Sequence, residues 1–146
     1  MQAKYVALGT LTGMFLAVVV AKQLNQDETL TGSVTRVRDG KTIEVGDAPV
    51  RLNGVAAPAL EEPFGREAQA FLTRLVFGRT VTCELNGQRT LNRAIGVCYL
   101  DGQDIAASII AAGLARDCAR HSGGQYDEFN TTASKRLPLP DYCGPR

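Results

Sequence analysis

The sequence has little net charge, a single histidine and no internal repeat or low-complexity tract. Lys and Arg number 16 and Asp and Glu number 15, and the resulting net charge of +1 excludes a strong overall field that would gather nucleic acid. His121 stands alone and no Cys-x-x-Cys pair occurs, which excludes a structural zinc site. Tyr99 and Tyr126 do not form the aromatic stripe on which single-stranded bases stack.

The N-terminus carries the strongest compositional signal. Residues 5–21 form an apolar run without a charged side chain, and a lysine flanks the run on each side. Such a run is typical of an export signal, and its length reaches the lower limit for a transmembrane helix. We expect residues 1–23 to be a signal peptide or a signal-anchor transmembrane helix, and we favour the anchor because the run is longer than a usual signal core. A buried core helix is a third interpretation.

Cysteine usage agrees with export, because disulfides are typical of small exported domains. Cys83, Cys98, Cys118 and Cys143 allow three pairings. We expect Cys83–Cys98, on two strands of one predicted hairpin, and Cys118–Cys143, which would hold a Pro-rich tail to the domain. Four free thiols would instead fit a cytoplasmic protein, and a nucleophile pair of Cys118 and His121 is disfavoured by the even number of cysteines. We therefore place the domain on the non-cytoplasmic side, in a periplasm or its equivalent.

The rest of the chain has the size and composition of one globular domain at residues 31–146, after a polar linker at residues 24–30. Alternating apolar and β-branched residues predict five strands. These strands are Thr31–Val37, Lys41–Gly46, Val50–Asn53, Thr80–Leu85 and Arg93–Leu100. Apolar residues at helical spacing predict three helices. The helices are Pro63 to Gly78, Gln103–Ala112 and Gln125–Arg136, and the apolar face of the first consists of Phe64, Ala68, Phe71, Leu72, Leu75 and Val76.

The order of these elements indicates the fold. Three strands, a helix and two strands follow one another along the chain, and a five-stranded β-barrel with a helix after the third strand is the layout of an OB-fold. We therefore expect an α+β protein with an OB-fold barrel and three helices, preceded by the N-terminal apolar helix.

Five short motifs resemble, in the right order, the signature of the staphylococcal nuclease (thermonuclease) family. They are Arg-Leu-Asn-Gly-Val-Ala-Ala-Pro-Ala at 51–59, Pro-Phe-Gly-Arg-Glu-Ala-Gln-Ala-Phe at 63–71, Asp-Gly-Lys-Thr at 39–42, Leu-Asn-Arg at 91–93 and Gly-Leu-Ala at 113–115. Each motif is weak alone, but together they are specific and span most of the predicted domain. The resemblance implies the OB-fold with its three helices, which agrees with the order of the predicted elements.

The resemblance also implies a site whose acids are missing. Members of this family cleave phosphodiesters with one calcium ion, which two Asp carboxylates hold, while a Glu handles the attacking water and two Arg bind the phosphate. At the matching positions of this chain the arginines are kept as Arg51 and Arg93. Lys41 and Ala56 replace the two metal-binding acids, and Ala59 replaces the Glu.

This replacement removes the family's usual chemistry. Calcium requires oxygen ligands, and a methyl group or a lysine supplies none. Without a metal or a base, no group lowers the pKa of water or takes its proton. We expect no metal or other cofactor, and a metal-free anion site made of Arg51, Arg93 and Lys41. Two alternatives remain: Glu61 and Glu62 could supply replacement acids for a calcium site, or the arginines could be purely structural partners of Glu84 or Asp101.

These expectations describe a pseudoenzyme. We predict an exported, membrane-anchored nuclease-like module that has lost calcium-dependent phosphodiesterase chemistry. It would bind an anionic polymer, either nucleic acid or glycan, or serve as an accessory subunit with a protein partner in an envelope or membrane assembly, while residues 5–21 contact the membrane. The alternative is a divergent thermonuclease-type endonuclease that hydrolyses DNA or RNA.

Overall fold

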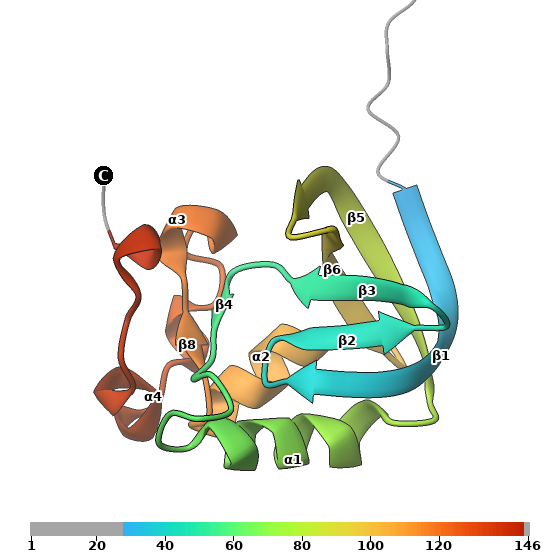
Figure 1. The fold of residues 1–146 in the computed structure, drawn as a ribbon. Helices are drawn as coiled ribbons and strands as arrows, with labels where there is room; N and C mark the ends of the chain where they lie inside the picture. The colour runs from blue at the N-terminus through green and yellow to red at the C-terminus, as the bar shows by residue number, and fades with distance from the viewer. Residues whose placement is uncertain (1–27, 145–146) are drawn as a thin grey trace, which may run out of the picture.

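A computed structural model describes residues 28–144, and its main feature is a sheet that closes on itself (Figure 1). The strands are β1 (Glu28–Asp39), β2 (Thr42–Val45), β3 (Ala48–Leu52), β5 (Thr80–Thr90), β6 (Arg93–Leu100) and β7 (Gln103–Asp104). They are ordered β3-β2-β1-β5-β6-β7, with antiparallel neighbours. β3 also pairs with β6 in parallel, and this pairing joins the two ends of the five-strand series.

Two helices complete the core beside this sheet. α1 (Gly65–Val76) buries Ala68, Leu72 and Val76, which recur at helical spacing on one face. α2 (Ile105–Ala111) buries Ile105, Ala106, Ile109 and Ile110, which lie on one face. Asp104 caps its N-terminus by accepting a hydrogen bond from the backbone N–H of Ala106 at 2.8 Å. Figure 1 shows α1 running below the sheet, alongside the C-terminal part of β1. Burial of these apolar side chains against the inner face of the strands supplies the main driving force for folding.

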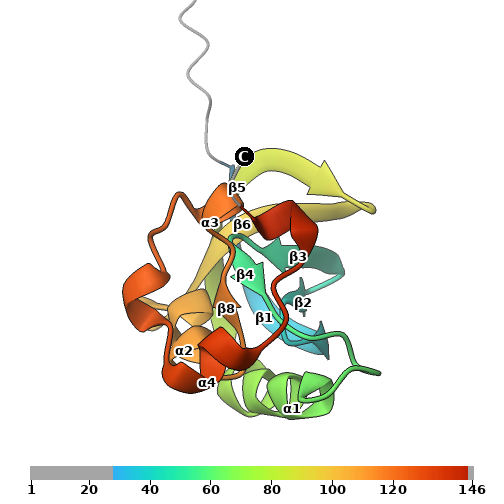
Figure 2. The same ribbon diagram turned by 90° about the vertical axis from the view of Figure 1, so that its left-hand side faces the viewer.

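The C-terminal part forms a second, smaller layer. β4 (Val55–Ala56) pairs with β8 (Arg116–Asp117) in a separate two-stranded sheet. Short helical segments follow β8. These segments are α3 (Ala119–Ser122), the 3-10 turn η1 (Asp127–Phe129), α4 (Thr132–Arg136) and the 3-10 turn η2 (Asp141–Cys143). Figure 2 shows this orange-to-red segment running across the side of the molecule where β4 and β8 lie.

Both expected disulfides are present. Cys83 on β5 and Cys98 on β6 are direct register partners, and they are bonded to each other. Cys118 is bonded to Cys143, so the tail is held to the segment that follows β8. All four cysteines are buried.

The structure confirms the five predicted strands and corrects several boundaries. β1 begins at Glu28, three residues before its predicted start. The first helix begins at Gly65 rather than Pro63, because Phe64 has a left-handed backbone with φ of 68°. Phe64 is therefore not part of the apolar helix face, and its side chain is exposed.

The predicted third helix at Gln125–Arg136 is wrong. The structure divides this stretch into η1 and α4, with extended residues between them. Thr131 has an extended backbone and caps α4 by accepting a hydrogen bond from the backbone N–H of Ser134 at 3.1 Å, which explains why a new helix starts there. The count of three helices is also wrong, because residues 28–144 contain four α-helices, of which α3 was not predicted.

The predicted N-terminal apolar helix at residues 1–23 lies outside the residues that the structure describes. Among residues 28–144, no helix combines the length and the apolar character needed to cross a membrane.

Candidate anion-binding site

A pocket of about 450 Å³ opens between the closed sheet and the C-terminal tail. Lys41, Arg51 and Arg93 all line it, so the structure brings together the three cations that the sequence singled out. No carboxylate lines this pocket within residues 28–144. Its remaining walls include His121 and Tyr142 from the C-terminal layer.

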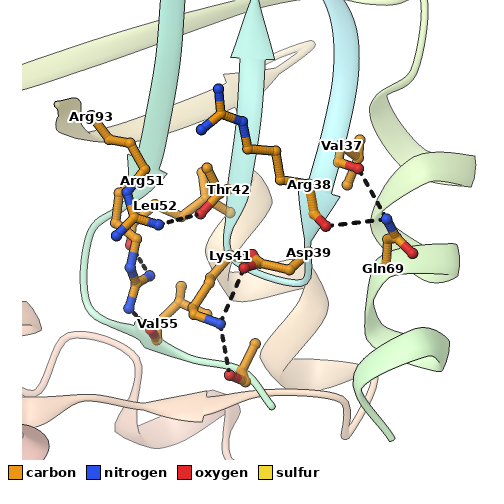
Figure 3. A network of polar contacts seen from close by, with 11 residues as sticks. Val37, Arg38, Asp39, Lys41, Thr42, Arg51, Leu52, Val55, Gln69 and Arg93 are labelled. Atoms are coloured by element: carbon orange, nitrogen blue, oxygen red, sulfur yellow. Dashed lines mark hydrogen bonds and ion pairs between the residues drawn. The ribbon is translucent and has the colours of Figure 1, made fainter. Parts of the chain in front are cut away.

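The strand register explains why the two arginines meet. Arg51 lies on β3, where it pairs with Ile95 of the parallel strand β6. Arg93 lies two residues before Ile95 on the same strand. Because side chains two residues apart project from the same face of a strand, Arg51 and Arg93 emerge on one side of the sheet (Figure 3).

Arg51 is anchored by the turn that follows its strand. Its Nη1 donates to the carbonyl of Leu52 at 3.0 Å and its Nη2 donates to the carbonyl of Val55 at 2.8 Å (Figure 3). Burial lowers the pKa of Arg51, whereas the neighbouring Tyr142 raises it. An arginine has five N–H donors, so these two bonds fix the guanidinium and leave donors free for a ligand.

Arg93 is held more loosely. Its Nη1 donates to the hydroxyl of Thr42 at 3.2 Å, and its Nε donates to the carbonyl of Thr90 at 3.3 Å. The Thr42 side chain is fully buried at the start of β2, so it offers a fixed acceptor. The structure therefore positions Arg93 toward the pocket with neutral partners only.

The purely structural interpretation of the arginines is not supported by the ion pairs of residues 28–144. Arg51 and Arg93 bond to backbone carbonyls and a hydroxyl, and neither is paired with Glu84 or Asp101. Asp101 is instead paired with Arg79 at 3.0 Å on the surface. The positive charges of the pocket arginines are thus not neutralised by a direct carboxylate contact.

Lys41 lies in the β1–β2 turn and reaches toward the segment after β4. Its Nζ is 3.3 Å from Oδ2 of Asp39 and donates to the carbonyl of Ala57 at 3.2 Å (Figure 3). The Lys41 and Asp39 side chains are mostly buried. Asp39 also accepts a hydrogen bond from the Lys41 backbone N–H at 2.9 Å, as a turn aspartate does.

The residues at the family's metal position do not fit calcium. Calcium binds several oxygen ligands, and here a lysine ammonium already takes the Asp39 carboxylate and the Ala57 carbonyl. Ala56 is buried and packs in a small apolar cluster with Cys118 and Cys143. No group of three His, Cys, Asp or Glu residues within 28–144 is arranged to hold a metal ion.

The candidate replacement acids lie elsewhere. Glu61 and Glu62 are exposed in the loop before α1, and neither lines the pocket. Ala59 is half-buried, and its carbonyl accepts from the backbone N–H of Glu62 at 3.0 Å. The arrangement therefore joins the three expected cations but does not bring either glutamate to them.

Sequence reasoning missed one wall of the pocket. Tyr142 lies beside Arg51, and its ring is 6.3 Å from the ring of His121, centroid to centroid. Tyr142 immediately precedes Cys143, so the expected disulfide with Cys118 was the signal that could have located it. The sequence alone did not indicate that this disulfide would place the tyrosine at the arginines.

Comparisons with known proteins agree with the resemblance seen in the motifs. Residues 49–136 match the family model described as staphylococcal nuclease homologue, which implies the OB-fold. The matched range includes Arg51, Ala56, Ala59 and Arg93, whereas Tyr142 lies beyond its end.

Several proteins share this similarity. An uncharacterized endonuclease of Escherichia coli is 32% identical over 105 residues, which are 68% of this chain and 63% of that protein. An uncharacterized endonuclease of Haemophilus influenzae is 26% identical over 110 residues, 72% of this chain and 61% of that protein. The succinoglycan biosynthesis protein ExoI of Rhizobium meliloti is 29% identical over 136 residues, 85% of this chain and 71% of that protein. The chain spans less than two thirds of the length of these endonucleases.

Proposed function

The chain belongs to the staphylococcal nuclease homologue family, and we propose that it is a metal-independent anion-binding module of that family rather than a calcium-dependent nuclease. The observation that carries this proposal is the position of the Lys41 ammonium. It contacts the Asp39 carboxylate and the Ala57 carbonyl, at the place where the resemblance puts a metal-binding acid. The Lys41 ammonium, a cation of the chain itself, thus takes the place of the calcium ion that the family mechanism requires.

The charges of the pocket support the binding of an anion. Lys41, Arg51 and Arg93 converge on a space whose lining includes no carboxylate within residues 28–144. The Lys41 charge is paired with Asp39, so the two arginines carry the positive charge that has no direct carboxylate contact. A guanidinium matches the geometry of phosphate, sulfate or carboxylate oxygens through two parallel N–H groups. Because Arg51 is already fixed by two backbone carbonyls, less side-chain entropy is lost when it binds a ligand.

The same residues argue against hydrolysis by the family mechanism. That mechanism needs a metal to activate water and a carboxylate to handle its proton. Ala56 and Ala59 supply neither, and the exposed Glu61 and Glu62 lie outside the pocket lining. General acid–base catalysis alone contributes factors of about 10² to 10⁴, so its loss would leave little turnover.

We place this module outside the cytoplasm, anchored through residues 5–21. The two disulfides support an oxidising compartment.

The ligand would be an anionic polymer, and the relative named for succinoglycan biosynthesis makes a polysaccharide as reasonable a candidate as nucleic acid. An accessory role in a membrane assembly is part of the same proposal, and co-purification of a protein partner with the full chain in mild detergent would support it. Recovery of the full chain as a lone monomer under those conditions would count against this role.

The test measures cleavage and binding on the same protein. The full chain, purified in mild detergent with its disulfides oxidised, is incubated with DNA and RNA in calcium, in other divalent ions and in chelator, beside Arg93→Ala. We expect no cleavage above that variant. We also expect the full chain to bind pyrophosphate in chelator, and Arg51→Ala/Arg93→Ala to bind it at least tenfold more weakly, because each charged contact is worth about 1.5 kcal/mol or more.

A divergent endonuclease is the second candidate, favoured by the names of the Escherichia coli and Haemophilus influenzae relatives. Metal-dependent cleavage that is lost in Arg93→Ala would establish it and overturn our proposal. Loss of that cleavage in Glu61→Ala/Glu62→Ala would identify the replacement acids. Metal-independent cleavage lost in His121→Gln would instead assign the proton transfer to the histidine at the pocket wall.

A further inference from the structure

The C-terminal tail supplies an aromatic wall to the cationic pocket. Tyr142 lines the pocket beside Arg51, and its ring lies at 6.3 Å from that of His121 with a tilt of 55° between the ring planes. Tyr142 is 48% exposed, so part of its ring is available to a ligand. Leu91, which is 85% exposed at the β5–β6 turn, also lines the pocket.

We infer that Tyr142 is a specificity-determining residue of this pocket, which selects anions carried on a flat ring over anions without one. The inference rests on the proposed anion-binding function. Arg51 and Arg93 would hold the charged group, and the exposed ring of Tyr142 would stack on the ring that bears it. Stacking on an aromatic side chain adds affinity without a requirement for particular hydrogen bonds, so it selects a class of ligand rather than one compound.

The Cys118–Cys143 disulfide sets the position of this wall. Tyr142 lies in η2, next to Cys143, which is buried against Cys118 and Ala56. Besides the disulfide, the turn is closed by a bond from the Cys143 backbone N–H to the carbonyl of Pro140 at 2.8 Å. Within residues 28–144 the disulfide is the only cross-link from this turn to a residue that lines the pocket, so its loss should release Tyr142 from Arg51.

Two phosphate esters of equal charge test the inference. Methyl phosphate and phenyl phosphate present the same dianion at pH 8, and only the second carries a flat ring. Their dissociation constants for the oxidised full chain are measured in chelator by NMR titration. We expect phenyl phosphate to bind about tenfold more tightly, a ratio within the range that aromatic stacking produces.

Variants of the protein test whether Tyr142 causes the preference for phenyl phosphate. Tyr142→Ala should bring the two dissociation constants within about twofold of each other while methyl phosphate still binds, and Tyr142→Phe should retain the preference. Phe77→Ala is the matched control, because Phe77 is 59% exposed and does not line the pocket. Cys118→Ser/Cys143→Ser should behave as Tyr142→Ala does, whereas Cys83→Ser/Cys98→Ser should keep the preference.

Each outcome distinguishes this inference from the proposal on which it rests. If neither phosphate ester binds, the anion-binding function itself fails. If methyl phosphate binds but phenyl phosphate binds no more tightly, the pocket recognises the phosphate group alone. Tyr142 then plays no part in the choice of ligand. A preference for phenyl phosphate that survives in Tyr142→Ala would also overturn the inference, since the ring would then contact another wall.

Discussion

Replacement of Arg51 should cost more stability than replacement of Arg93, although both line the same pocket. The Arg51 guanidinium donates to the carbonyls of Leu52 and Val55, at 3.0 and 2.8 Å, and so ties together the two sides of the turn between β3 and β4. The two bonds of Arg93 are 3.2 and 3.3 Å long, near or beyond the usual upper limit for a good N–H···O contact.

The size of the difference follows from these contacts. A hydrogen bond to a charged group contributes about 1.5 to 3 kcal/mol, so two bonds at the lower end contribute about 3 kcal/mol. Removal of Arg51 also relieves the cost of burying its charge, the effect that lowers its pKa. We expect Arg51→Ala to lower the free energy of unfolding by about 2 kcal/mol, and Arg93→Ala to lower it by less than about 1 kcal/mol.

Urea unfolding followed by far-UV circular dichroism measures this difference, because the sequence has no tryptophan for fluorescence. A third variant, Arg51→Lys, retains the charge but lacks the fork that reaches two carbonyls, and it should lose about 1 kcal/mol. Equal stabilities of Arg51→Ala and Arg93→Ala would refute the role assigned to the turn contacts. The expected result would make Arg93→Ala the cleaner variant for measurements of ligand binding.

Two further predictions concern the framework behind the pocket. The buried Tyr126 hydroxyl donates to Oδ2 of Asp104 at 2.7 Å, so Tyr126→Phe should lower the free energy of unfolding by about 2 kcal/mol. Burial raises the pKa of Tyr126 above its usual value of about 10, so this stabilisation is complete below pH 10 and declines at higher pH, which denaturation at pH 8 and pH 11 will measure. A Cβ on Gly65 would overlap the carbonyl oxygen of Ala59, so Gly65→Ala should cost about 3 kcal/mol in urea unfolding. Gly87→Ala, at a left-handed position in open space, should cost only about 1 kcal/mol, and equal losses would contradict the overlap.

Local sequence patterns predicted most of the framework. Strand alternation and helix periodicity reflect the environment of each residue, and so they located the five strands, α1 and α2 within about three residues, except that β5 continues to Thr90 beyond its predicted end at Leu85. The prediction of a third helix at Gln125–Arg136 was wrong because the apolar pattern there is weak and Thr131 caps a separate helix, α4, inside this stretch. The placement of Phe64 on the apolar helix face was wrong because its backbone is left-handed, a conformation that the spacing of apolar residues does not encode.

The candidate site was predictable only in part. The resemblance pointed to Arg51 and Arg93, and their convergence follows from the parallel pairing of β3 with β6. The partner of the Lys41 ammonium, the Ala57 carbonyl, is 16 residues away along the chain and becomes a neighbour only in the folded protein. Tyr142 was missed although its disulfide was predicted, because the bond ties the tail to Cys118 after β8, and the nearness of Cys118 to Arg51 on β3 appears only in the folded protein.

Ala56 both replaces a metal-binding acid of the family and packs against the disulfide that holds the C-terminal tail. The resemblance places a metal-binding carboxylate at this position, but here the methyl group is 2% exposed and packs on Cys118 and Cys143. A carboxylate at that point would be removed from water and set against a disulfide, which disfavours its charged form. The methyl group of Ala56 thus packs against the disulfide that holds Tyr142 at the pocket, and a methyl group supplies no ligand for a metal.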